Sequence, residues 1–427
     1  MKNDHHPRTK ATAAPPETLQ DSGSKSPLDR RAFLVTASSA LGLAAIQTLL
    51  PSATVSAAAS PEDPTRTPGA APSPYGSRAT SEPAQRLTSS TRSLTPLQQL
   101  SGIITPSALH FERHHNGIPS IDPERHRLLV HGLVRQPMLF TVEELKRFPA
   151  QSRLTFIECS GNSGKEWKGP HGRTVQDTHG LTSTSEWTGA ALATVLHEAG
   201  ISPDATWVLA EGSDAAALTR SLPLQSVLKD ALLCYAQNGE PLRPEQGYPL
   251  RLLIPGWEGN TCVKWLRRLK LMAHPAMTRE ETSKYTDLMP DGTARQFTFE
   301  MDAKSVVTSP SGGQQLTQTG FTEIRGLAWS GRGRITHVDV STDGGKTWQP
   351  AELQQPVLPM CHTRFRSGWQ WNGQEAIIQS RCQDETGYLQ PALADLVAVR
   401  GLNSYYHNNA IQSWKVTKDG QVNNVQI

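Results

Sequence analysis

The chain has 427 residues, enough for two or three domains with substantial hydrophobic cores. Its formal net charge of +3 is small for this length, which argues against a nucleic-acid-binding protein. None of the five cysteines falls in a C-x-x-C or C-x-x-C-H pattern, and this argues against a zinc ribbon and against covalently attached haem.

The first 59 residues predict an export signal. Arg30 and Arg31 form a twin-arginine pattern, an uncharged stretch follows, and small residues at 57–59 offer a cleavage site. A single membrane span is the alternative, since about 20 apolar residues suffice to cross a bilayer. Polar residues such as Gln47 make this stretch only weakly apolar. We therefore expect a twin-arginine signal peptide over 1–59 and a periplasmic mature protein without a membrane span.

Residues 60–95 are rich in Pro, Ser, Thr and Ala and predict a flexible linker, because such a segment cannot bury enough apolar surface to fold. The patterns that follow, over 96–300, mix strands and helices and indicate an α+β domain. Among them are a strand over 127–134, a capping box from Thr141 that opens a short helix, and a helix over 191–199.

One stretch in this domain predicts a strand that runs into a tight loop. Alternation places Phe156 on one face of the strand and Ile157 and Cys159 on the other, with the cysteine where the backbone turns. Gly161 and Gly164 would allow the turn to adopt positive φ and would leave backbone N–H groups free to hold an anion. The sequence therefore predicts a thiol that projects from a rigid support into a cleft. A buried structural cysteine is the alternative.

Past residue 300, short alternating strands separated by Gly and Asp turns indicate an all-β sandwich over 301–427. Within it, Ser341-x-Asp343-x-Gly345-x-Thr347-Trp348 fits the Asp-box pattern of sialidases and carbohydrate-binding propellers. A glycosidase would need several such boxes and a carboxylate pair, whereas the chain has one box and no repeat of 40 to 50 residues. The box is more simply a stable hairpin corner. The sandwich alone would also fit an exported binding or adhesion module.

From about residue 96 to 427 the chain resembles the sulfite oxidase family of molybdenum enzymes. The matching stretches are Glu158-Cys159-Ser160-Gly161-Asn162, Phe111-Glu112-Arg113-His114-His115, Tyr248 to Arg251, Trp257 to Leu266, Arg325 to Arg334 and Tyr406 to Val416. The resemblance implies a molybdopterin-binding α+β domain followed by an immunoglobulin-like dimerisation domain.

The family's residue roles imply that Cys159 ligates molybdenum beside the dithiolene of a molybdopterin. They imply a catalytic role for Arg113, since a guanidinium recognises oxyanions in a plane. The residues that would bind the cofactor are His115, Cys159, Ser160, Gly161, Asn162, Arg251 and Lys264.

Two further catalytic residues are implied with alternatives. The family sends an arginine from a glycine-rich turn back to the active site, and Arg334 fits this position best, although a gap of one residue would make it Arg332. Tyr285 is the nearest candidate for the catalytic tyrosine, but it could instead occupy the position of a neighbouring tryptophan. Cys234, Cys262, Cys361 and Cys382 are expected to be buried, with a disulfide among them left open.

Departures from the family pattern favour one substrate. Ser163, Gly164, Ser185, Glu186 and Gln246 stand where many sulfite oxidases carry arginine, alanine or histidine, and this lowers the positive charge expected around the substrate. The pattern resembles the sulfane dehydrogenase branch, which belongs to the Sox sulfur-oxidation system and oxidises a sulfane sulfur on a protein cysteine arm. Free sulfite is the alternative substrate. The implied partners are the Sox sulfur-carrier protein, a c-type cytochrome as electron acceptor, and a second subunit in a homodimer or hetero-oligomer.

Overall fold

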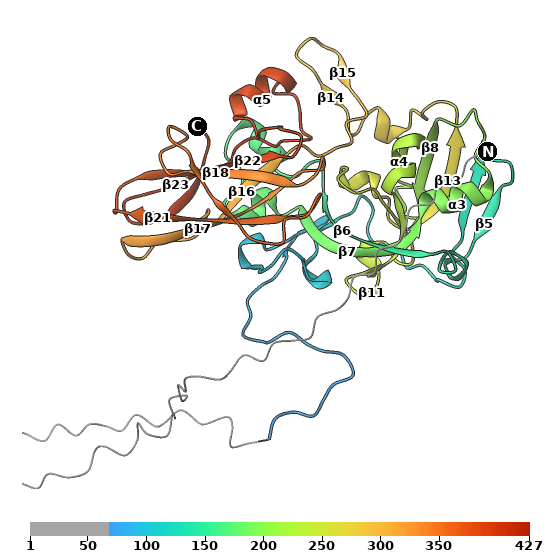
Figure 1. Cartoon of the computed structure of the whole chain (residues 1–427), viewed down its shortest axis with the longest axis horizontal. Coiled ribbons are helices and arrows are strands. Elements are labelled where there is room, and N and C mark those ends of the chain that lie inside the picture. Colours follow the sequence, from blue (N-terminus) through green and yellow to red (C-terminus); the bar gives the residue numbers. More distant parts are fainter. Residues whose placement is uncertain (1–67) are drawn as a thin grey trace, which may run out of the picture. The chain divides into compact units, whose positions relative to one another are not determined.

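A long antiparallel strand pair, β6 (Ala150–Glu158) and β7 (Thr182–Ala191), runs between two groups of strands in the computed structural model (Figure 1). The structure describes residues 68–427, so the twin-arginine motif and its cleavage site lie outside the described residues. The elements discussed below belong to one compact unit, Arg78–Ile427. No helix of the described residues has the length and apolar character needed to cross a membrane.

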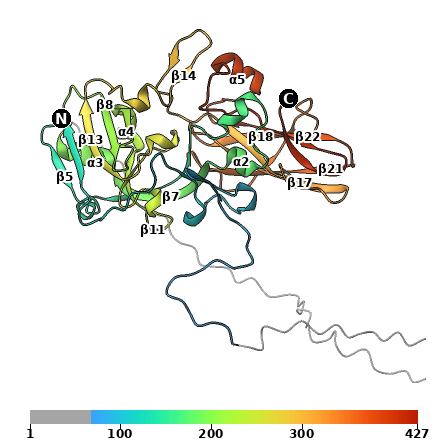
Figure 2. The same cartoon turned by 180° about the vertical axis from the view of Figure 1, so that it is seen from behind.

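Two five-stranded sheets make up the α+β part. The first sheet joins β6 and β7 to β10 (Leu232–Gln237), β11 (Glu240–Pro241) and β12 (Arg251–Leu253). The second has the order β5 (Met138–Phe140), β4 (Leu128–Gly132), β13 (Leu266–Met272), β8 (Trp207–Gly212) and β9 (Thr219–Pro223). Only β4 and β13 pair in parallel in the second sheet. Helices α3 (Leu192–Ala199) and α4 (Leu224–Asp230) pack beside these strands (Figure 2).

Local sequence signals in this α+β part are confirmed. Helix α1 (Val142–Leu145) begins after Thr141, whose hydroxyl accepts from the Glu144 amide while the Glu144 carboxylate accepts from the Thr141 amide. Helix α3 ends at Gly200, which adopts a φ of +74° as a left-handed C-cap. These caps satisfy terminal backbone groups that would otherwise lack partners.

The all-β part is a sandwich of two sheets, as the strand spacing predicts. One sheet has the order β16 (Lys304–Ser309), β17 (Gly320–Trp329), β21 (Thr363–Trp371) and β20 (Glu352–Leu353). The other has the order β19 (Gln349–Pro350), β18 (Ile335–Ser341), β22 (Ala376–Asp384), β23 (Ser413–Val416) and β24 (Val422–Val425). Helix α5 (Leu393–Arg400) lies between β22 and β23 in the chain.

The Asp-box motif is a self-satisfied hairpin corner. The Asp343 carboxylate accepts from the Ser341 hydroxyl at 2.8 Å and from the amide and hydroxyl of Thr347 at 3.0 and 2.7 Å. These bonds hold the pKa of Asp343 down at about 2. The motif therefore serves the turn, as its simpler interpretation predicts.

The predicted linker over 60–95 is wrong at its carboxyl-terminal end. Strands β1 (Leu87–Thr88) and β2 (Arg92–Leu94) form a small sheet with β3 (Glu112–Arg113). Leu94 is buried in the core, and this burial is what orders a stretch that composition alone indicated to be loose.

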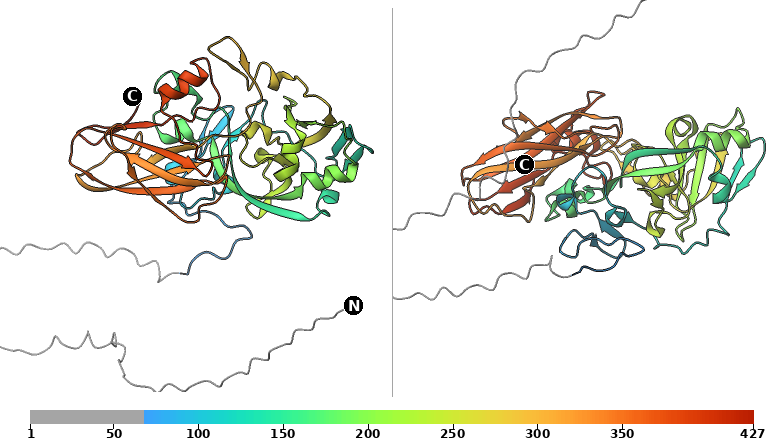
Figure 3. Two further views of the ribbon diagram at one scale, coloured as in Figure 1. Left: turned by 45° about the horizontal axis from the view of Figure 1, so that its top comes forward. Right: turned by 60° about the horizontal axis from the view of Figure 1, so that its bottom comes forward.

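Strand β6 separates the two hydrophobic cores. Phe156 packs into the core of the sandwich, whereas Ile157, its neighbour, packs into the core of the α+β part. The predicted alternation is confirmed, but both faces of the strand are buried. Cys159 follows at the end of this strand, so two cores support the loop that carries it. In Figure 3 the green strands can be followed between the orange sandwich and the yellow-green sheets.

Candidate active site

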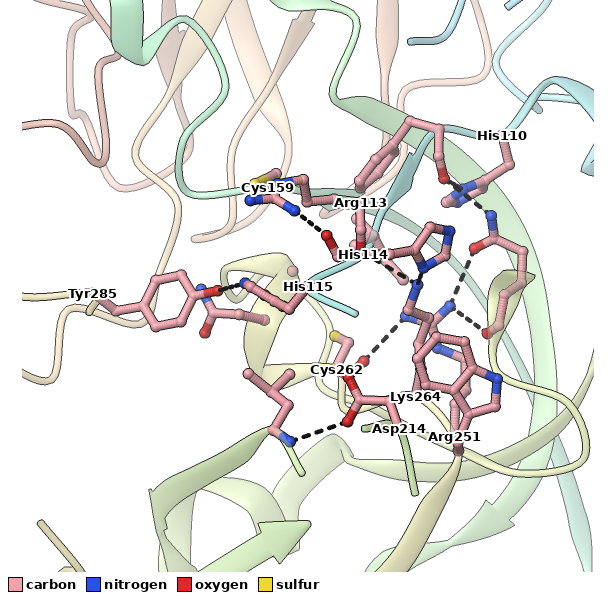
Figure 4. A pocket seen from close by; sticks show the side chains of 17 residues that line it. His110, Arg113, His114, His115, Cys159, Asp214, Arg251, Cys262, Lys264 and Tyr285 are labelled. Carbon is pink, nitrogen blue, oxygen red and sulfur yellow. Dashed lines mark hydrogen bonds between the residues drawn. The ribbon is translucent and has the colours of Figure 1, made fainter. Parts of the chain in front are cut away.

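The thiol of Cys159 opens into a pocket of about 680 Å³ (Figure 4). The polar residues that line this pocket are His110, Arg113, His114, His115, Cys159, Asp214, Gln246, Asn260, Arg251, Lys264 and Tyr285. They come from segments far apart in the sequence, brought together where β3, β12 and the cysteine loop meet. Five of the predicted site residues, Arg113, His115, Arg251, Lys264 and Tyr285, share this pocket with Cys159.

The cysteine loop is a short hydrogen-bonded turn. The Cys159 amide donates to the Leu181 carbonyl at 3.0 Å, and the Cys159 carbonyl accepts from the Asn162 amide at 2.8 Å. The left-handed residue is Ser163, with a φ of +57°, so the prediction of positive φ at Gly161 and Gly164 is wrong.

The two glycines are needed for close packing instead. A Cβ on Gly164 would lie 2.4 Å from the carbonyl oxygen of Tyr405, and one on Gly161 would lie 3.1 Å from the Tyr405 ring. A segment from the end of the chain thus lies directly on the loop, where a larger residue at either position would clash.

Burial raises the pKa of the Cys159 thiol, while the Gly161 amide and the Arg113 charge oppose that rise. A thiol in this state is a poor free nucleophile at neutral pH, because only the thiolate reacts. A cation that binds the sulfur would favour the deprotonated form. The environment fits a ligand of a metal better than a nucleophilic cysteine.

Tyr285 and His115 form a hydrogen-bonded pair at the same end of the pocket. The Tyr285 hydroxyl lies 3.1 Å from His115 Nε2. Burial, followed by the Arg113 charge, lowers the pKa of His115 to about 4, so the imidazole is neutral at pH 7 and can accept a hydrogen bond from the hydroxyl. Burial and the nearby Cys159 raise the pKa of Tyr285 well above its usual value, so the phenol stays protonated.

Two cations, Arg251 and Lys264, lie at the other end of the pocket. Arg251 donates to the Gln246 carbonyl at 2.9 Å and to the Cys262 carbonyl at 3.2 Å. Lys264 Nζ lies 2.9 Å from His114 Nδ1 and 3.1 Å from the Glu245 carbonyl. Burial, and then the Arg251 charge, lower the pKa of Lys264 to about 7. An anion placed here would relieve the repulsion between the two cations.

Several buried polar atoms of the pocket have no partner within residues 68–427: Arg251 Nε, His110 Nε2 and Asn260 Oδ1. A buried donor or acceptor without a hydrogen bond costs about 1–3 kcal/mol, so such atoms are uncommon in native proteins. Their position around one cavity beside two cations fits an anionic group that carries many hydrogen-bonding atoms. A pterin with a phosphate is such a group.

Ser160, Gly161 and Asn162, also predicted to bind the cofactor, are not among the residues that line the pocket. Asn162 donates from its side chain to Glu158 at 2.9 Å and accepts from the Leu181 amide at 3.1 Å. Ser160 accepts from the side chain of Asn260 at 3.2 Å. Ser160 and Asn162 are buried, so these residues shape the cysteine loop.

Arg334 and Arg332 also lie outside the pocket. Arg334 is half-exposed and pairs with Glu385 at 3.2 Å, and Arg332 pairs with Asp302 at 2.6 Å. Carboxylates hold both guanidinium groups at the surface of the sandwich. The prediction that this turn returns an arginine to the active site therefore finds no support in the geometry of the chain.

Sequence patterns missed His110, His114, Asp214, Asn260 and Trp265, all of which line the pocket. Asp214 stands alone in the sequence without a motif, and only the fold places it here, whereas His110 directly precedes the Phe111 to His115 stretch. Of the five departures that lowered the expected charge, only Gln246 lines the pocket, whereas Ser163 and Gly164 line a separate hollow behind the loop. All five cysteines are free, so the open question of a disulfide is answered in the negative.

Comparisons with known proteins agree with this site. A model of the oxidoreductase molybdopterin binding domain matches residues 115–280, and a model of the Mo-co oxidoreductase dimerisation domain matches residues 295–414. Mitochondrial sulfite oxidase of Mus musculus is 31% identical over 389 residues, which cover 83% of this chain and 70% of the relative. The chain belongs to the sulfite oxidase family.

Two further relatives delimit its place within the sulfite oxidase family. The NADH nitrate reductase 1 of Oryza sativa subsp. japonica is 34% identical over 323 residues, but these cover only 34% of that longer protein. The crystal structure of the sulfane dehydrogenase SoxCD from Paracoccus pantotrophus superposes with a TM-score of 0.79 at 46% identity, covering 83% of this chain and 96% of that one. The chain is thus a molybdopterin oxidoreductase that is structurally close to SoxC, and the predicted molybdenum cofactor and two-part fold are confirmed.

Proposed function

We propose that this protein is a sulfane dehydrogenase. It oxidises a sulfane sulfur bound to a carrier protein and passes the electrons to a c-type cytochrome. The observation that carries this proposal is the pocket, in which Cys159 faces Arg113 and the Tyr285–His115 pair, two cations lie at the far end, and several buried polar atoms have no partner among residues 68–427. The likeness to SoxCD supports the choice within the family.

Each end of the pocket has its own task. Arg251 and Lys264 bind the phosphate and the polar ring edge of the pterin, for which charge-assisted hydrogen bonds are suited. Cys159 ligates the metal as a thiolate. The bound molybdenum cofactor supplies two-electron redox chemistry at its metal. Cys262 is the other cysteine that lines the pocket, and its sulfur is engaged with the backbone of Ile254.

Arg113 and Tyr285 act on the substrate side. The Arg113 guanidinium stabilises negative charge that develops on oxygen during sulfur oxidation. Neutral His115 accepts a hydrogen bond from the Tyr285 hydroxyl at Nε2. The lone pairs of the phenol oxygen therefore stay free to accept a hydrogen bond from substrate or water. The proposal therefore assigns catalytic roles to both residues, and a cofactor-positioning role to His115.

The substrate follows from the charge of the pocket. Arg113 is the cation at the substrate side, and Gln246 contributes no charge. A small dianion such as free sulfite would be held weakly by so few cations, whereas a sulfur atom on a protein arm gains affinity from the docked carrier. Free sulfite remains the second candidate, and the identity to mouse sulfite oxidase favours it.

The remaining assignments belong to this proposal. The domains are a signal peptide over 1–59, the molybdopterin domain over 96–300 and the dimerisation domain over 301–427. The signal directs the protein to the periplasm by the twin-arginine route, which exports folded proteins with the cofactor inserted. The match to a dimerisation domain supports a homodimer or a complex with the cytochrome subunit.

The test is the metal and pterin content of the purified mature protein, measured by mass spectrometry together with turnover. We expect about one molybdenum per chain, turnover with carrier-bound sulfane sulfur, and little turnover with free sulfite. Cys159→Ser should keep the fold and the pterin but lose turnover, while Cys361→Ser, at a buried cysteine outside the pocket, should keep turnover per molybdenum. Efficient oxidation of free sulfite would favour the second candidate, and full activity of Cys159→Ser would refute the site.

A further inference from the structure

Tyr405 lies on the back of the cysteine loop and reaches the surface. A Cβ on Gly161 would be 3.1 Å from Tyr405 Cε1 and 3.9 Å from Cys159 Sγ, so the ring carbon and the sulfur can be no further apart than the sum of these distances, 7.0 Å. The Tyr405 side chain is 47% exposed. One residue thus links the surroundings of the Cys159 sulfur to solvent on the side away from the pocket.

A second path from the pocket ends at the same residue. The Tyr285 ring, which lines the pocket, is 5.2 Å from the Tyr406 ring, and that ring is 5.4 Å from the Tyr405 ring. Electron tunnelling falls off steeply with distance and is favoured by contiguous packed groups. Both paths are short and continuous, and they converge on one exposed tyrosine.

The surface around Tyr405 suits a protein partner. Its amide donates a hydrogen bond to the Asp287 carboxylate at 3.1 Å, which ties Tyr405 to the hairpin of β14 (Asp287–Leu288) and β15 (Ala294–Arg295). Helix α5 lies beside this hairpin in Figures 1 and 2, and Gly401 at its end packs against Pro290. These segments expose three further apolar side chains: Leu288, Val399 and Leu402. Exposed apolar residues gathered in this way mark interaction sites.

The hollow beside Tyr405 is basic. Arg92, Lys165 and Arg173 line it, and none of them forms an ion pair with a carboxylate in the part of the chain that the structure describes. Its three cations outnumber its two carboxylates, which are Glu166, an acceptor from the Gly172 amide at 2.9 Å, and Asp177, which closes the capping box of α2 (Val175–His179). The hollow therefore attracts an acidic partner.

We propose that electrons leave this protein through Tyr405 to an acidic c-type cytochrome that docks over Tyr405 and the adjacent basic hollow. This rests on the proposed function, since it needs a redox centre at Cys159. Each S–O bond formed takes its oxygen from one water molecule and releases two electrons and two protons; two ferric haems each take one electron, and the protons pass to bulk water. Redox partners commonly use small, weak interfaces with an apolar centre and charged surroundings, which is the pattern here.

The experiment compares Tyr405→Ala and Tyr405→Phe with Phe321→Ala, a control at another exposed aromatic residue on the sandwich. Turnover of the holoenzyme is measured with ferricyanide and with a purified acidic monohaem cytochrome c. We expect Tyr405→Ala to lower the cytochrome rate at least tenfold more than the ferricyanide rate, Tyr405→Phe to retain most of the cytochrome rate, and Phe321→Ala to change neither.

Binding of the same ferric cytochrome, followed by isothermal titration at low salt, provides a readout that needs no turnover. Lys165→Glu with Arg173→Glu should weaken this binding at least tenfold. The proposal would be overturned if Tyr405→Ala lowered the ferricyanide and cytochrome rates equally, or if the double variant bound the cytochrome as tightly as the wild type. It would also be overturned if Tyr405→Ala dissociated a dimer without affecting the cytochrome rate. Absence of molybdenum from the wild type would instead refute the proposed function, while the binding data would still report on the docking surface.

Discussion

Two sets of buried charged side chains, one beneath the cysteine loop and one at the far end of the pocket, differ in how they are paired. Beneath the loop, Glu158 bonds to Lys304 at 2.7 Å and Glu258 bonds to Arg220 at 2.7 Å, with all four side chains at most 1% exposed. At the pocket, Arg251 and Lys264 have no carboxylate within ion-pair distance among the described residues.

The pKa values follow this difference. Burial alone would raise the pKa of Glu258, but Arg220 and His407 overcome it and hold the pKa at about 2. Burial lowers the pKa of Arg251, and it lowers that of Lys264 to about 7. A buried charge that is paired within the chain serves the fold, whereas a buried charge left unpaired is suited to a ligand of opposite charge.

The largest effect on stability is expected beneath the loop. Lys304→Met leaves the Glu158 carboxylate buried without its cation, and this should lower the free energy of unfolding by about 3–5 kcal/mol. The double variant Lys304→Met with Glu158→Gln removes the charge and should recover most of the loss. Urea unfolding of the three proteins measures both values. A single variant as stable as the wild type would show that this pair does not hold the two domains' cores together at β6.

At the pocket, the same kind of change should affect the ligand more than the fold. Arg251→Met removes charge-assisted bonds to the pterin and should lower pterin affinity by about tenfold to a hundredfold. The free energy of unfolding of the apoprotein should stay within about 1 kcal/mol of the wild type, because an unfavourably buried cation is lost as well. Arg267→Met, at an exposed arginine paired with Glu211, is the control and should leave pterin content unchanged. A destabilisation as large as that of Lys304→Met would erase the distinction between the two sets.

Lys264 offers a test by pH. Its folded pKa of about 7 lies below the unfolded value of about 10.4, so the unfolded chain binds more protons between these values and stability rises with pH in this window. From pH 6 to pH 8, the apoprotein should gain about 1 kcal/mol relative to Lys264→Met. The comparison with the variant cancels the buried cysteines, which titrate above this range. In the holoprotein the cofactor anion restores the lysine charge, so the gain should vanish; equal slopes in both forms would place the anion elsewhere.

The sequence predicted the ends of helices, the strand before Cys159 and five of the pocket residues that lie in motifs. Those signals are local, since the Thr141 capping box and the Gly200 C-cap need only neighbours in the chain. It failed where a partner comes from far away. Leu94 is ordered by a distant core, and Gly164 is small because Tyr405 lies on it. Asp214 reaches the pocket only through the fold, and the carboxylates that hold Arg334 and Arg332 could not be read from their motif.

The smallest effect is expected for a pair that belongs to neither set. Lys146 and Glu143 pair at 2.6 Å on α1, but their side chains are 43% and 74% exposed. Water screens such a pair and two flexible side chains must be held in place, so Lys146→Met should change the free energy of unfolding by at most about 0.5 kcal/mol. The same urea titrations measure this value. The N–O distance is close to that of the Glu158–Lys304 pair, so a difference in the stability lost between the two variants can be assigned to burial. A loss of several kcal/mol in Lys146→Met would mean that the N–O distance, and not burial, sets the contribution of an ion pair to stability.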